Sequence, residues 1–192
     1  MCAMADLTVR RLRILLYLGA KNLKADYIPM REMQHILAAL MPQNRLVCEV
    51  CLATGLRISD ALSLKTAALA PVMVVVEHKT GKKKRIRLPK QLLARLFENA
   101  GNVYVFEHRT DENKHRCRQA VWRDMKRAAK LFRIPKNVSC HSTRKLYAVN
   151  KFHKHGDLHK LKIDLNHTHD SVTLLYAFAD IVSQRKKNNR KT

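Results

Sequence analysis

Apolar residues recur at helical spacing over most of this 192-residue chain. We expect a first helix to begin near Pro29, because proline suits the first turn of a helix. The apolar face of this helix consists of Met33, Ile36, Leu37 and Leu40. Gly55 is suited to end the next helix, since glycine readily adopts the left-handed conformation of a helix C-terminus. The same periodicity predicts further helices at residues 45–54, 57–64, 116–132, 142–153 and 158–165, one opening at Pro89, and a last one that carries Tyr176.

The period changes in the middle of the chain. Residues 72–76 are apolar and mostly β-branched, residues 79–82 supply a turn, and residues 85–88 alternate between basic and apolar. This pattern predicts a β-hairpin. Residues 103–106 predict another short strand. The fold class is therefore mostly α with one small antiparallel β-sheet (α+β).

The sequence predicts a single folded domain with a short segment at each end. It has no internal repeat and no long linker rich in proline, glycine or serine, and 46% of its residues are hydrophobic, which is enough for a substantial core. We expect an N-terminal lead-in at residues 1–28, one folded domain at 29–184 and a basic C-terminal tail at 185–192.

The charge balance indicates the kind of partner. The chain has 38 Lys and Arg against 15 Asp and Glu, a formal net charge of +23. Such an excess repels itself in a compact fold unless a polyanion shares the surface, and nucleic acid is the obvious polyanion. A membrane surface is the competing partner, but no apolar run approaches the ~20 residues that span a bilayer. The five cysteines lack the spacing of a disulfide framework, which favours a reducing, cytoplasmic compartment.

Three clusters carry candidate chemistry. Arg57 precedes Asp60 by three residues, His141 precedes Arg144 by three, and His167 precedes Tyr176 by nine. A phosphodiester resists nucleophiles because its oxygens are negative, so an enzyme that attacks it must supply cationic donors, and arginine suits this role. A histidine with a pKa near ~6.5 can exchange a proton in the same site. Taken singly, each arginine reads as a surface ion pair and the tyrosine as a core residue.

The ordered set resembles the catalytic set of the tyrosine recombinases, the phage integrase family, over about residues 30–180. The resemblance implies a recombinase catalytic-domain fold and cleavage of DNA through a 3′-phosphotyrosyl intermediate, with no metal, ATP or other cofactor. Tyr176 would be the nucleophile. The residues that would assist it are Arg57, His141, Arg144 and His167, with Asp60 in a supporting role and Lys79 as the general acid. Lys82 is the second candidate for the general acid.

The chain departs from the family pattern at three positions. Asp60 replaces the more usual glutamate, Lys145 follows Arg144 where the family has histidine, and Asn166 precedes His167 where the family has glycine. Asparagine also visits left-handed backbone conformations, so that exchange is tolerable. A DNA-binding surface is expected from Lys82, Lys83, Lys84, Arg85 and Lys145.

The partners implied are double-stranded DNA and further copies of the chain, as a tetramer on synapsed sites and a monomer in isolation. Family members usually carry an N-terminal DNA-clamping domain, which residues 1–28 cannot hold, so a catalytic fragment and a minimal integrase both stay open. Two other functions also stay open: a type IB topoisomerase and a non-catalytic basic DNA-binding module. Cys48 and Cys51 have metal-type spacing without a matching second pair, so burial in the core is the preferred interpretation.

Overall fold

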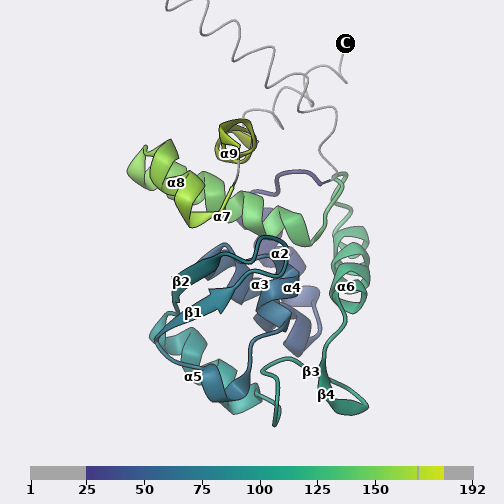
Figure 1. Ribbon diagram of the computed structural model, residues 1–192. Helices are drawn as coiled ribbons and strands as arrows, with labels where there is room; N and C mark the ends of the chain where they lie inside the picture. Colours follow the sequence, from purple (N-terminus) through teal and green to yellow (C-terminus); the bar gives the residue numbers. More distant parts are fainter. Residues whose placement is uncertain (1–24, 168, 180–192) are drawn as a thin grey trace, which may run out of the picture.

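The computed structural model describes residues 25–167 and 169–179 (Figure 1). The elements follow one another as α2 (Met30–Ala39), α3 (Pro42–Thr54), α4 (Ile58–Leu62), the 3-10 helix η1 (Thr66–Ala68), β1 (Val72–Val76), β2 (Lys83–Arg87), α5 (Lys90–Asn99), β3 (Glu107–His108), β4 (Asp111–His115), α6 (Arg118–Leu131), α7 (Cys140–His155), α8 (Leu158–Asp164) and α9 (Asp170–Ala177). The predicted class, mostly helical with a small antiparallel sheet, is confirmed.

Local sequence sets the ends of the two helices that matter most for the site. Proline occupies the first turn of α3, and Gly55 ends that helix in the left-handed region, with φ at 66° and its N–H bonded to the Cys51 carbonyl. Ser139 caps α7 through a reciprocal capping box with Ser142. These caps fix where the chain leaves α3 toward Arg57 and where α7 presents His141.

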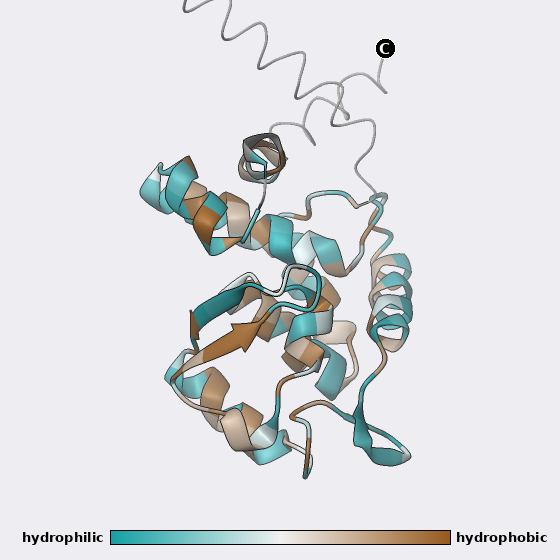
Figure 2. Cartoon of the chain, in the orientation of Figure 1, coloured by the Kyte–Doolittle hydropathy of each residue, from teal (hydrophilic) through white to brown (hydrophobic). Residues whose placement is uncertain are grey.

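The predicted first hairpin is present, with its second strand at Lys83–Arg87. β1 and β2 pair antiparallel with Val74 opposite Arg85, and Val76 opposite Lys83. Inward residues of the hairpin, such as Val75 and Ile86, join the core, while its outer face sets exposed valines of β1 beside exposed basic residues of β2. Figure 2 shows this as an apolar strand beside a hydrophilic one.

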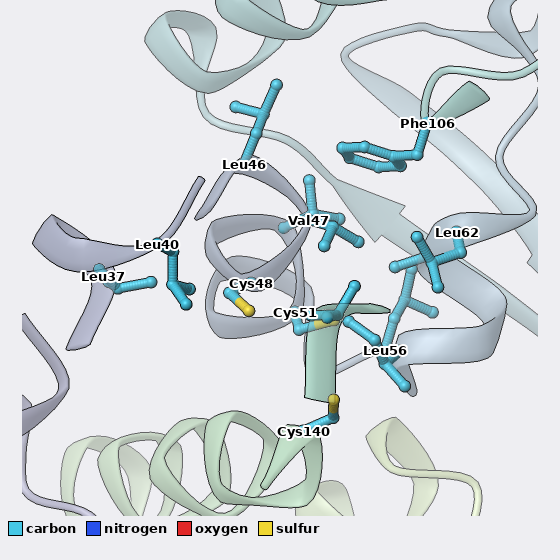
Figure 3. Packing of buried hydrophobic residues seen from close by; sticks show 14 of the residues in the cluster. Leu37, Leu40, Leu46, Val47, Cys48, Cys51, Leu56, Leu62, Phe106 and Cys140 are labelled. Atoms are coloured by element: carbon cyan, nitrogen blue, oxygen red, sulfur yellow. The ribbon is translucent and has the colours of Figure 1, made fainter. Parts of the chain in front are cut away.

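The core is divided by α7. The larger cluster contains residues from all the α-helices from α2 through α6, from the β1–β2 hairpin and from the N-terminal part of α7. Figure 3 shows Cys48, Cys51 and Cys140 within this cluster. The smaller cluster contains Ala148, Leu161, Leu165 and Ala177, with Tyr176 packed against it. Helix α7 thus contacts α3 on one side and α8 and α9 on the other, so the segment with Tyr176 docks through α7.

The prediction was wrong at the second strand. Residues 103–106 form no strand; Tyr104 makes only an isolated bridge to Lys65, while Val105 and Phe106 are buried as core residues. The second two-stranded sheet is instead the polar hairpin of β3 and β4. Its sequence lacks the apolar alternation that identifies a strand, because most of its side chains lie at the surface.

Candidate active site

Four of the predicted residues surround one pocket of about 390 Å³. Arg57 comes from the turn between α3 and α4, Lys79 from the β1–β2 turn, and His141 and Arg144 from the first turns of α7. His141 and Arg144 lie three residues apart on the helix, as the shared-face argument requires. The pocket is therefore lined by basic side chains from three separate parts of the chain.

Arg57 is held by carboxylates beneath the pocket. Its Nη1 lies 2.5 Å from Oε2 of Glu77 and 3.9 Å from Oδ2 of Asp60, and both carboxylates are fully buried. Oδ1 of Asp60 accepts a hydrogen bond of 3.0 Å from the His78 backbone N–H. The Asp60 carboxylate is thus close to the guanidinium, as expected, but Glu77 is the closer partner.

Arg144 joins the first cluster to the third. Its Nη1 donates to the Gly55 carbonyl at 2.5 Å, and its Nη2 donates to the Leu165 carbonyl, two residues before His167. Since a guanidinium has five N–H donors, these two bonds leave others for a bound anion. Arg144 therefore fixes the chain around His167 while it lines the pocket.

His167 and Tyr176 lie outside the wall of the pocket but within the electrostatic influence of Arg144. The Nδ1 of His167 is 3.1 Å from the Thr173 hydroxyl oxygen, and Asn166 adopts a positive φ of 49°, in line with its replacement of glycine. Burial raises the pKa of Tyr176, while the charges of Arg144 and Arg57 act to lower it. The tyrosine thus lies within the field of both arginines.

His141 is available for proton exchange at the surface of the pocket. Partial desolvation lowers its pKa, and the cationic neighbours Arg144 and Lys145 lower it further. A neutral imidazole at neutral pH can accept a proton, which is what a base for the tyrosine hydroxyl requires.

Tyr147 is held in a different network. Its hydroxyl donates to Oδ2 of Asp164, and Lys151 donates to the same hydroxyl at 3.0 Å. Burial, followed by the bonded Asp164 carboxylate, raises the pKa of Tyr147. This tyrosine is held in a hydrogen-bond network away from the pocket, and Tyr176 stays the candidate nucleophile.

The sequence matches the phage integrase family over residues 26–181. The chain belongs to this family. It is similar to the tyrosine recombinase of Thermosipho africanus, with 28% identity over 163 residues that cover 79% of this chain and 56% of that protein. The chain spans about half the length of the curated relatives it matches.

Solved structures show the same fold. A lambda integrase dimer bound to a COC′ core site is similar with a TM-score of 0.69 and 21% identity, covering 81% of this chain and 60% of that one. A lambda integrase tetramer bound to a Holliday junction is similar with a TM-score of 0.65 and 21% identity, covering 79% and 47%. The expected recombinase-like catalytic-domain fold of the phage integrase family is confirmed.

Two residues of the expected DNA-binding surface are in the interior instead. Lys84 is 5% exposed and donates to the Thr54 carbonyl at 2.8 Å, and burial lowers its pKa to about 8. Lys145 is 2% exposed and donates to the Ala25 carbonyl. The placement of Lys84 on a phosphate-binding edge was wrong because side chains alternate along β2, so it faces inward between Lys83 and Arg85. Lys145 lies on the inward face of α7, so it too has no surface position.

Sequence reasoning missed two residues near the pocket. Glu77 directly follows the apolar strand β1, and an acidic residue at the end of an apolar run, two before the candidate lysine, was the available signal. Arg118, the first residue of α6, lines the pocket and adds a further cation to it. Nothing in the local sequence of Arg118 distinguishes it from the other basic residues of α6.

Cys48, Cys51 and Cys140 behave as buried apolar side chains, whereas Cys117 is exposed. Burial raises the pKa of Cys48 and Cys51, and that of Cys140 to about 11, so these thiols stay protonated. Within residues 25–167 and 169–179, no group of three or more His, Cys, Asp or Glu side chains is arranged to hold a metal ion. None of the helices in that same part of the chain is both long and apolar enough to span a bilayer.

Proposed function

We propose that this chain is the catalytic part of a site-specific DNA recombinase or integrase. The observation that carries the proposal is the convergence of Arg57, Lys79, His141 and Arg144 on one pocket, with Tyr176 within the electrostatic influence of both arginines. Cationic donors fixed around an anion site stabilise the crowded, highly charged transition state of a phosphodiester. Family membership and the fold support the same reaction.

In the proposed reaction, the Tyr176 hydroxyl oxygen forms a bond to the scissile phosphorus. Its proton passes to His141 as the general base, and Arg57, Arg144 and His167 hold the nonbridging oxygens. The bond from phosphorus to the 5′ oxygen breaks, and Lys79 gives that oxygen a proton. The products are a 3′-phosphotyrosyl link and a free 5′ hydroxyl, and attack by a 5′ hydroxyl of a partner duplex reverses the step. All the groups that this requires are side chains of the chain, so cleavage is expected to proceed in EDTA.

Double-stranded DNA is the proposed substrate and further copies of the chain the proposed partners. The two similar lambda integrase structures are described as a dimer on a core site and a tetramer on a Holliday junction. The net charge of +23 supports attraction to DNA, and the proposed place of action is the cytoplasm.

The test is covalent capture on a nicked suicide duplex, from which the cleaved fragment diffuses away. The unaltered chain should form an adduct that survives denaturing electrophoresis, and Tyr176→Phe should bind DNA normally and form none. Tyr147→Phe is the matched control, because it removes a half-buried hydroxyl on the neighbouring α7 and should leave the adduct intact. An adduct from Tyr176→Phe would overturn the nucleophile, and a folded, DNA-binding chain that forms none at all would favour a simple binding module. Relaxation of supercoiled plasmid by the monomer would favour a type IB topoisomerase.

A further inference from the structure

Glu77 has an unusual position for a carboxylate in a protein that attacks phosphates. It directly follows β1, its side chain is fully buried, and its two oxygens face different arginines. Oε2 lies 2.5 Å from Nη1 of Arg57, and Oε1 lies 3.9 Å from Nη1 of Arg144. Burying a carboxylate costs several kcal/mol in lost hydration. The ion pairs between Glu77 and the two guanidiniums have to offset this cost.

We propose that Glu77 is a positioning residue that holds Arg57 and Arg144 together as one phosphate-binding unit and ties them to the turn carrying Lys79. This rests on the proposed DNA cleavage and deepens it. Glu77 does not touch the substrate; it acts through the two arginines and the turn.

The two arginines need such a residue because their charges repel. Burial lowers the pKa of Arg144, the charge of Arg57 lowers it further, and Glu77 acts in the opposite direction. Asp60 is a weaker partner, since its nearer oxygen stays 3.9 Å from Arg57 while the other accepts the His78 N–H. Among the described residues, Glu77 is the carboxylate within 4 Å of both guanidiniums.

The same residue closes the turn of Lys79. The Gly81 N–H donates to the Glu77 carbonyl at 2.8 Å, and the Glu77 N–H donates to the Lys82 carbonyl at 3.0 Å. The Thr80 hydroxyl donates to Oε2 at 2.9 Å, the oxygen that also binds Arg57. A shift of the Glu77 side chain therefore moves both an arginine and the turn of the candidate general acid.

A purely electrostatic role and a positioning role predict different effects of Glu77→Gln, and this difference makes the proposal testable. A carboxylate beside an anion site repels the phosphate, so Glu77→Gln should bind DNA at least as tightly as the unaltered chain if charge alone matters. If Glu77 positions the arginines, the same variant should cleave more slowly by roughly 10- to 10²-fold, as misplacement of a catalytic group by about 1 Å does. The signature is a slower single-turnover rate at saturating DNA without a loss of affinity.

The matched control is Glu49→Gln. Glu49 also pairs with two arginines, 2.8 Å from Arg45 and 2.5 Å from Arg95, but it lies outside the pocket. Its loss should leave the single-turnover cleavage rate within about twofold, since surface ion pairs contribute little to a distant site.

A double-mutant cycle decides whether Glu77 acts through Arg57. The cleavage rates of Glu77→Gln, Arg57→Ala and the double variant are measured on one suicide duplex, with melting temperatures of the free variants as the folding check. Because Glu77 also acts through Arg144 and the Lys79 turn, the proposal expects Glu77→Gln to slow cleavage less in the Arg57→Ala background than in the unaltered chain. Equal losses in both backgrounds, or no loss from Glu77→Gln, would overturn it.

Two further outcomes keep the test decisive. If Glu77→Gln does not fold, Thr80→Val removes the hydroxyl contact to Oε2 together with a 3.4 Å contact from the Lys82 N–H. It should show a smaller loss of rate that is reduced further in the Arg57→Ala background; additivity there overturns the proposal. If the unaltered chain forms no adduct, it is the proposed function that fails. If the unaltered chain forms an adduct and a folded Glu77→Gln variant cleaves equally fast, only the proposed role of Glu77 is disproved and the proposed function stands.

Discussion

The imidazole of His167 stands edge-on to the ring of Tyr176, with centroids 5.0 Å apart and planes at 72°. The Thr173 hydroxyl lies 3.1 Å from Nδ1 and fixes the orientation of the imidazole from within α9. His167 and the candidate nucleophile therefore pack as one unit. Arg144 binds the Leu165 carbonyl just before them and so joins this unit to the phosphate pocket.

The first prediction concerns the charge of His167. Burial lowers its pKa to about 3, with further lowering by Arg144, Arg57 and Lys84. Above pH ~6.5 the ring is neutral in both the folded and the unfolded chain; between pH ~6.5 and 3 only the unfolded chain takes up the proton, so stability falls as pH falls through that window. The contribution lost between pH 7 and pH 5 is about 2 kcal/mol.

Chemical denaturation at both pH values checks this. His167→Gln should lose that part of the pH dependence, whereas His159→Gln, at an exposed position, should keep it. An unchanged difference between pH 7 and pH 5 in His167→Gln would show that the ring is protonated in the folded protein.

Removal of Arg57 and removal of Arg144 should slow cleavage similarly but lower the melting temperature by different amounts. Arg57→Ala and Arg144→Ala should each slow cleavage by on the order of 10²- to 10³-fold, as the loss of one oxyanion donor does. Arg144→Ala should also lower the melting temperature more, because it leaves the Gly55 and Leu165 carbonyls without their buried donors. Single-turnover cleavage and thermal melts of both variants measure this. Equal melting temperatures would contradict the structural role of Arg144.

Lys79 and Lys82 can be separated by the leaving group. Lys79 lines the pocket and Lys82 does not, so Lys79 is the expected general acid. Lys79→Ala should cleave slowly on an ordinary duplex and recover on one with a 5′-thiolate leaving group, since that group needs no proton. Lys82→Ala is the matched control on the same turn and should respond equally to both duplexes. Recovery specific to Lys82→Ala would reverse the assignment.

Periodic patterns predicted most of the helices and the first hairpin, whereas the candidate site residues came from the resemblance to the phage integrase family. The helices and first hairpin follow from regular apolar spacing, and Gly55 and Asn166 both adopt the left-handed backbone expected of them. The pattern failed where side chains carry no periodic signal, as in β3 and β4. Glu77 was missed because its contact to Arg57 spans 20 residues, and its position directly after an apolar run was the one signal in the sequence.

Gly55 is constrained by a contact that adds to its backbone conformation. A Cβ at this position would lie 2.4 Å from Cε1 of Tyr147, whose ring is held by Asp164 and Lys151. Gly55→Ala should therefore destabilise the protein by more than the ~1 kcal/mol expected for a strained φ alone. Equilibrium unfolding of Gly55→Ala in the Tyr147→Ala background should show a smaller penalty. The same penalty in both backgrounds would mean that backbone strain is the whole effect.

The last prediction separates the outer face of β2 from its inner face. Lys83 and Arg85 are exposed on one side of the strand and Lys84 is buried on the other, so only the first two can reach DNA phosphates. DNA affinity should fall roughly 10³-fold or more between 50 and 200 mM salt, and the slope against log salt should become shallower by about one unit for each exposed charge that is removed. Lys83→Gln and Arg85→Gln should show that change without loss of stability. Lys84→Gln should instead lower the melting temperature and keep the slope, because it disturbs the buried contact to Thr54. Titrations of all three variants at several salt concentrations decide the matter; a shallower slope for folded Lys84→Gln would show that this lysine reaches the DNA after all.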